Sequence, residues 1–111
     1  MSDRHADPVS ESVIVADILV AVSALDGAMF YRNNTGALPN RQGRMVTFGL
    51  KGSADILGVH RGRAVAIEAK TPTGRQRTSQ VRFQEAWERA GGIYILARSA
   101  SDALRGLGVA A

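Results

Sequence analysis

The chain contains no cysteine among its 111 residues. This absence excludes a disulfide framework and a structural zinc site of the thiolate type. The first residues, MSDRHADPVSES, also lack the basic-then-apolar pattern of a signal peptide. Because nothing ties the protein to an oxidising compartment, we expect it to work inside the cell, in the cytoplasm.

A long apolar run is missing as well. The longest one, SVIVADILVAVSAL, is too short to cross a bilayer and is interrupted by Asp17. We therefore expect a soluble protein with no membrane partner.

Basic residues exceed acidic ones. The chain has 14 Lys and Arg against 10 Asp and Glu, which gives a formal net charge of +4. A basic excess favours a polyanionic partner such as nucleic acid, although ribosomal, chromatin and other basic proteins share it. An adaptor that binds other proteins is disfavoured, because the sequence offers no obvious exposed aromatic patch.

The chain length fits one domain, which we place at residues 10–111 after a flexible tail over residues 1–9. A first helix, capped by Ser10 or Ser12 and ended by Gly27, carries apolar residues around most of its circumference and is predicted to be well buried. Residues 32–44 read as a loop rich in Asn, Gly and Arg.

Three strands are predicted next, over residues 45–50, 55–60 and 64–70. Both faces of the last two are mainly apolar, so we expect the sheet to be covered on both sides. A helix over residues 80–90, capped by Ser79, a strand over 93–97 and a short helix after Ser99 or Ser101 complete the chain. This order of elements predicts an α/β sandwich.

Three charged residues interrupt the apolar strands. A tight turn centred on Arg61-Gly62 places Asp55 directly opposite Glu68. Opposed side chains have Cβ atoms roughly 4.5–5.5 Å apart, a spacing at which two carboxylates repel each other. Lys70, two residues beyond Glu68 on the same face, is one group that could compensate this charge. A divalent cation such as Mg²⁺, which takes oxygen ligands from one or two carboxylates, is the other.

Two helix residues face the same region. Gln80 belongs to the inward stripe of the second long helix, where it either caps the helix or orients a water or a phosphate. Glu11 lies in the first turn of the first helix, where a carboxylate favours the helix dipole whatever else it does.

Basic and small residues flank these acids. The Gly52-Ser53 pair permits close approach of backbone or ligand. Basic groups around a short acidic site are what binding to a phosphate backbone requires. The candidate DNA-binding residues are Arg32, Lys51, Ser53, Arg75 and Arg77.

The motif Asp55, followed thirteen residues later by Glu68-Ala69-Lys70, resembles the signature of the PD-(D/E)XK nuclease superfamily. The runs KGSAD and IEAKTPTGRQRTSQVRFQEAWERAGGIY are similar to the compact VRR-NUC group, known from stand-alone phage nucleases and larger repair nucleases. The proline that precedes the aspartate in the superfamily is replaced by Ala54.

The resemblance implies a fold, a site and a reaction. The implied fold is a restriction-endonuclease-like core of order αβββαβ(α), with a mixed four-stranded central sheet flanked by helices. Asp55, Glu68 and the Ala69 carbonyl would bind Mg²⁺ or Mn²⁺, and Glu11 would be the first-helix acid of the metal site. Lys70 would orient or activate the hydrolytic water, and Gln80 would be the helix residue characteristic of the group.

We therefore expect a metal-dependent DNA endonuclease, in a bacterium or a phage-infected cell. A homodimer that cuts four-way (Holliday) junctions is the predicted form, since two symmetric cuts need two active sites related by a two-fold axis. The alternatives are a nuclease for flaps or splayed arms and a catalytically inert nucleic-acid-binding module of the same fold.

Overall fold

A computed structural model describes residues 10–109 of the chain. The predicted tail over residues 1–9 and the last two residues lie outside this range. The elements, in chain order, are α1 (Glu11–Ser23), β1 (Ala28–Arg32), β2 (Gly36–Pro39), β3 (Met45–Phe48), β4 (Ile56–His60), β5 (Arg63–Ala69), α2 (Thr78–Arg89), β6 (Ile93–Ala97) and α3 (Ala100–Gly106).

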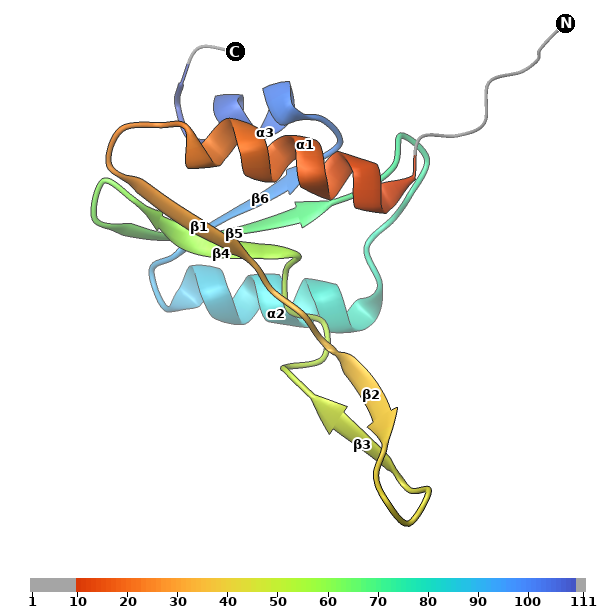
Figure 1. Ribbon diagram of the computed structural model, residues 1–111. Coiled ribbons are helices and arrows are strands. Elements are labelled where there is room, and N and C mark those ends of the chain that lie inside the picture. The colour runs from red at the N-terminus through yellow and green to blue at the C-terminus, as the bar shows by residue number, and fades with distance from the viewer. Residues whose placement is uncertain (1–9, 110–111) are drawn as a thin grey trace, which may run out of the picture.

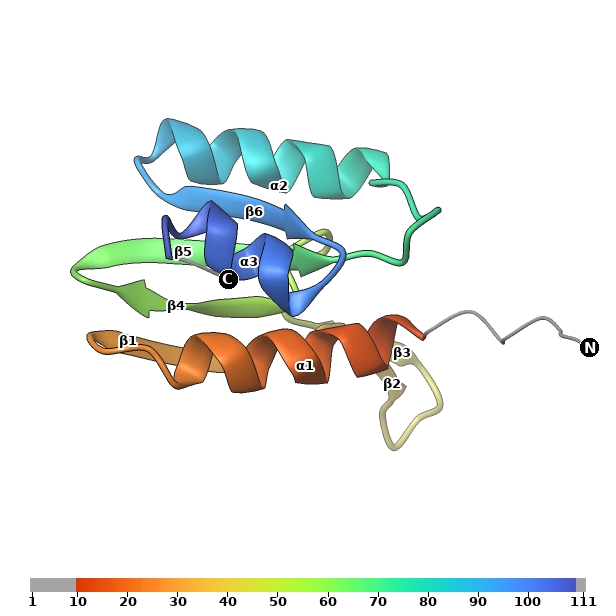
Figure 2. The same ribbon diagram turned by 90° about the horizontal axis from the view of Figure 1, so that it is seen from above.

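The body of the protein has three layers (Figures 1 and 2). Its central sheet has the strand order β1-β4-β5-β6. The sheet is mixed, because β5 and β6 are parallel whereas the other neighbouring strands are antiparallel. Helices α1 and α3 cover one face, and α2 covers the other. This arrangement confirms the predicted α/β class with a mixed four-stranded sheet.

The hairpin formed by β4 and β5 has the predicted register. Its turn residues, Arg61 and Gly62, both have positive φ angles, of 50° and 82°. Such angles define the two-residue turns whose twist matches that of paired strands. Ile56 therefore pairs with Ile67, and the same register brings Asp55 opposite Glu68.

The core lies between the sheet and the helices α1 and α3. The Ser10 side chain accepts a hydrogen bond from the backbone N–H of Val13 and caps α1. The helix buries one apolar face against the sheet strands, formed by Ile14, Val15, Ile18 and Val22. The prediction of burial around most of the helix is wrong, because Val13 and Val20 on its outer side are exposed.

The first strand of the sheet is not the one predicted. Residues 28–32, for which no strand was expected, form edge strand β1 and pair with β4. Strand β3, within predicted strand 45–50, pairs instead with β2 in a separate two-stranded sheet, so the predicted loop over residues 32–44 contains a strand. Which partner a short strand takes depends on tertiary packing rather than on its own composition.

The second face of the sheet is covered only in part. Helix α2 packs against β6. Strands β1 and β4 leave Met29, Tyr31 and Val59 exposed on this face, so the expected cover on both sides is present but partial here. Within residues 10–109, no helix combines the length and apolar character that crossing a membrane requires.

Candidate active site

The predicted site residues meet at one end of the central sheet. Asp55 immediately precedes β4, Glu68 lies near the end of β5, and Lys70 follows that strand. Helices α1 and α2 both begin at this end (Figure 2). Their N-termini carry partial positive charge, which favours an anion nearby.

Asp55 is held by the strand opposite it. Its Oδ2 atom accepts a 2.8 Å hydrogen bond from the backbone N–H of Ala69. Burial raises the pKa of the Asp55 carboxyl, while the hydrogen bond from Ala69 and the positive charges of Lys70 and Arg32 oppose that rise. The hydrogen bond therefore fixes the orientation of the carboxyl group, and the nearby positive charges do not fully offset the cost of burying its negative charge.

Glu68 is almost fully buried, with 1% of its surface exposed. Its Oε2 atom accepts a 2.7 Å hydrogen bond from the Gln80 amide and lies 3.4 Å from the Lys70 ammonium. Its Oε1 atom is buried and has no hydrogen-bond partner among residues 10–109. Burial, and then the negative charge of Asp55, raise the pKa of Glu68 to about 7.

These carboxyl groups fit a hard divalent cation. Lys70 pairs with one oxygen of Glu68 and leaves the other unsatisfied, so the ion pair alone does not compensate the site. Two carboxylates and a main-chain carbonyl, such as that of Ala69, are a ligand set that Mg²⁺ accepts together with waters and substrate phosphate. In the part of the chain described, Glu11 does not join Asp55 and Glu68 in a three-carboxylate cluster.

Gln80 links the second helix to strand β5. Its Oε1 atom accepts a 2.8 Å hydrogen bond from the backbone N–H of Arg77, the residue that precedes α2. Its amide nitrogen donates to Glu68. One side chain thus caps the helix and orients the buried carboxylate, whereas the predicted cap, Ser79, lies within the first turn.

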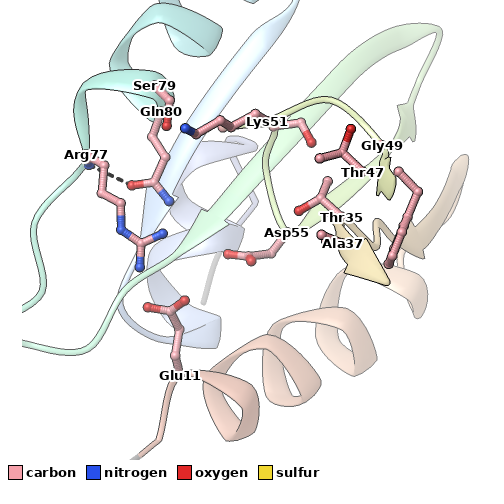
Figure 3. A pocket seen from close by; sticks show the side chains of 14 residues that line it. Glu11, Thr35, Ala37, Thr47, Gly49, Lys51, Asp55, Arg77, Ser79 and Gln80 are labelled. Carbon is pink, nitrogen blue, oxygen red and sulfur yellow. Dashed lines mark hydrogen bonds between the residues drawn. The ribbon is translucent and has the colours of Figure 1, made fainter. Parts of the chain in front are cut away.

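A cleft of about 710 Å³ opens beside these residues (Figure 3). Six of the predicted residues line it: Glu11, Lys51, Ser53, Asp55, Arg77 and Gln80. Figure 3 shows Glu11, Asp55 and Arg77 pointing into the cleft from the start of α1 and from the segments that precede β4 and α2. Arg32 and Arg75 do not line it, and neither do Glu68 and Lys70, which are buried.

Two residues that hold the site in place were not predicted. The Asn33 amide donates to the Ser53 hydroxyl at 2.7 Å and to the Ala54 carbonyl at 3.0 Å, and its backbone N–H donates to the Asp55 carbonyl at 2.8 Å. The Arg98 guanidinium donates to the carbonyls of Thr71 and Gly74 and fixes the loop after Lys70. Apart from the Ser53 hydroxyl, their partners are main-chain carbonyls, so no side-chain motif in the sequence marks them.

The Gly52-Ser53 pair permits a backbone contact. Gly52 has a φ angle of 83°, and a Cβ atom at this position would overlap the Ser79 carbonyl in the first turn of α2. The segment that leads to Asp55 therefore packs directly on the helix that carries Gln80.

No family model matches the sequence, and no curated protein does. A solved structure described as a VRR_NUC domain matches the fold with a TM-score of 0.62, over 88% of this chain and 94% of that one. The two sequences are 19% identical over the match. The chain therefore has the fold of a VRR_NUC domain, as the motifs around Asp55 and Glu68 predicted.

Proposed function

We propose that this protein is a Mg²⁺- or Mn²⁺-dependent DNA endonuclease. The observation that carries the proposal is the placement of Asp55 opposite Glu68 beside a cleft that Lys51 and Arg77 also line, with one buried Glu68 oxygen left unpartnered among residues 10–109. In the fold of a VRR_NUC domain, this arrangement suits hydrolysis of a phosphodiester bond.

Each site residue would have a separate role in the reaction. Asp55, Glu68 and the Ala69 carbonyl would hold the cation, with Glu11 as a further acid at the cleft wall. A bound divalent cation supplies positive charge for the transferring phosphoryl group and makes a neighbouring water more acidic. Gln80 keeps Glu68 oriented, and Lys70 offers its ammonium to charge that develops in the transition state.

Basic residues would bind the DNA backbone. Lys51 and Arg77 line the cleft with Ser53, and Arg32 lies near enough to Asp55 to influence its pKa. Arg75 lies outside the cleft, in the loop between Lys70 and α2. These groups would position a phosphate chain without selecting its sequence.

Branched DNA, with the four-way junction favoured, is the proposed substrate of a homodimer. One chain offers one active site, and symmetric cuts in two strands need two sites related by a two-fold axis. Val13 and Val20, on the outer face of α1, give the exposed apolar surface that such an interface requires.

The test is a panel of labelled DNAs incubated with Mg²⁺ or Mn²⁺. Single strands, duplexes, flaps, splayed arms and four-way junctions should be compared, with sedimentation at micromolar concentration beside them. We expect paired cuts in a symmetric junction by a dimer. A single unpaired nick by a monomer would favour flap or splayed-arm cleavage, and binding with no product under any metal would favour the inert module.

A further inference from the structure

Strands β2 and β3 form an arm that extends away from the body of the protein (Figure 1). We define the arm as residues 34–52. All eight strand residues are exposed, although a two-stranded hairpin alone is only marginally stable in water. The arm therefore presents a surface that a partner can cover.

One face of this arm is apolar. Leu38 pairs with Val46, and Gly36 pairs with Phe48, so the side chains of Leu38, Val46 and Phe48 share one face. They are 62%, 49% and 43% exposed. A Cβ atom at Gly36 would lie 3.0 Å from the Phe48 ring, so the ring lies across the glycine backbone and stays available to a partner.

The charged side chains of the arm are all positive. Residues 34–52 contain Arg41, Arg44 and Lys51 and no Asp or Glu. The tip that carries the two arginines is ordered, because the Asn40 side chain accepts hydrogen bonds from the backbone N–H groups of Gln42 and Arg44. A rigid, basic tip complements a polyanion.

The arm is also part of the proposed active site. Gly36, Ala37, Thr47 and Phe48 line the same cleft as Asp55. Asn33 ties the start of the arm to residues 53–55 at its end. Beyond Phe48, exposed Leu50 lines a second hollow of about 320 Å³ with Lys51, Arg82 and Phe83. A nucleic acid in the cleft would thus meet Phe48 directly, and Leu38 and Val46 continue the same face beyond the cleft, towards the tip of the arm.

We propose that the arm recognises branch points, with the face of Leu38, Val46 and Phe48 stacking on bases that a junction leaves without a neighbour. The proposal rests on the nuclease function above. An intact duplex hides its base faces, and its major groove is read by hydrogen-bonding groups that these side chains lack. Apolar side chains instead act as wedges where stacking is interrupted. Arg41 and Arg44 hold the neighbouring phosphates.

The experiment compares binding to a four-way junction and to a linear duplex in Ca²⁺. Phe48→Ala should lower the preference for the junction by at least about fivefold, the effect expected for one base stacked on an aromatic ring. Leu38→Ala should lower it by a smaller factor, because leucine offers apolar contact without an aromatic face. Phe48→Tyr should retain the preference. Arg41→Ala combined with Arg44→Ala should weaken both complexes and flatten their salt dependence. Met29→Ala, an exposed apolar residue on β1, is the matched control.

A deletion of the arm tests the proposal even if the point variants do not fold. Replacing residues 36–48 by two glycines joins chain ends that already touch, since a Cβ atom at Gly49 would lie 2.7 Å from Thr35 Cγ2. With a retained thermal transition, this variant should bind the junction no better than the duplex. An unchanged preference in Phe48→Ala, Leu38→Ala and the shortened chain would overturn the proposal.

Two outcomes separate this proposal from others. If the arm variants dissociate a dimer in sedimentation and lose preference only for that reason, the arm is an interface between copies, and the proposal is wrong. If the wild-type protein cuts no DNA under any metal, the nuclease function fails, while the binding preference in Ca²⁺ still decides the role of the arm.

Discussion

The side-chain amide of Gln80 donates a 2.7 Å hydrogen bond to the Oε2 atom of Glu68. The same side chain accepts a hydrogen bond from the backbone N–H of Arg77. The start of α2 and the buried acid of β5 are therefore held in one arrangement by a single residue. Because Lys70 contacts the same Glu68 oxygen, Gln80 also fixes the geometry of the acid–lysine pair.

Gln80→Ala should damage both stability and cleavage. The variant removes a helix cap, worth about 1 kcal/mol, and a hydrogen bond to a buried charged group, worth about 1.5–3 kcal/mol. We expect a lower thermal midpoint and at least about tenfold slower DNA cleavage. Gln42→Ala, an exposed glutamine in the arm, is the control and should change neither. Wild-type cleavage by Gln80→Ala would remove Gln80 from the site.

The metal-free protein should lose stability as the pH rises. The pKa of Glu68 is about 7 in the folded protein and 4.5 as its ordinary value, so the folded state favours the protonated acid. The stability that protonated Glu68 contributes is fully present below pH 4.5 and is lost as the pH rises through 7. The loss is on the order of 3 kcal/mol. Asp55, whose pKa is also raised, acts in the same direction.

Denaturant unfolding in EDTA at pH 5 and pH 8 measures this difference. Glu68→Gln should reduce the dependence on pH, because it replaces the titrating acid by a neutral side chain of similar shape. Glu85→Gln, an exposed carboxylate on α2, should leave it unchanged. A stability that rises from pH 5 to pH 8 in the wild type would contradict the burial of charge at Glu68.

Substitution of Lys70 should affect catalysis, whereas substitution of Arg75 or Arg77 should affect DNA binding. Lys70→Ala should slow cleavage by at least about 100-fold and keep DNA binding in Ca²⁺, because its proposed interaction forms in the transition state. Arg75→Ala and Arg77→Ala should weaken binding and lower the salt slope by about 0.9 for each DNA phosphate that is no longer neutralised.

Arg89→Ala, in the last turn of α2, provides the comparison for the arginines and should bind DNA as the wild type does. Unchanged affinity and salt slope in both Arg75→Ala and Arg77→Ala would remove their loop from the DNA interface. Weakened DNA binding by Lys70→Ala would show that this lysine acts in binding rather than in catalysis.

Gly52→Ala should be far more costly than Gly43→Ala. Both glycines have positive φ angles, so each substitution costs about 1–2 kcal/mol of backbone strain. A Cβ atom at Gly43 meets nothing within 4 Å among residues 10–109, whereas one at Gly52 overlaps the Ser79 carbonyl. We expect Gly52→Ala to be destabilised by a further 1–3 kcal/mol or so and to lose most of the cleavage activity. Equal thermal midpoints for the two variants would show that the packing of Gly52 on α2 does not matter.

The sequence predicted the part of the site that depends on local rules. The Arg61-Gly62 turn determines the register of β4 and β5, and that register brings Asp55 opposite Glu68. The stripe of α2 placed Gln80 towards β5, where it contacts Glu68. The α/β class followed from the order of the elements.

Long-range pairing and main-chain contacts escaped prediction. Strand β1 pairs with β4, which lies far from it in the sequence. Residues Met45 to Phe48 have the composition of a strand of the central sheet but pair with β2 in the arm. Propensity does not distinguish these partners. The Ala69 N–H that holds Asp55 is a main-chain donor, which every residue but proline carries. The Asn33 amide holds the Ala54 carbonyl as well as the Ser53 hydroxyl, and no motif links Asn33 to that segment.

The most direct test is the Mn²⁺ dependence of DNA cleavage by the wild type, Asp55→Asn and Glu68→Gln, measured on one labelled junction with thermal midpoints recorded for each protein. Both substitutions remove a charge while keeping the shape of the side chain. We predict cleavage that requires the metal in the wild type and is abolished in both folded variants at every Mn²⁺ concentration. Cleavage by the wild type in EDTA, or undiminished cleavage by either variant, would contradict the assignment of Asp55 and Glu68 to a catalytic metal site.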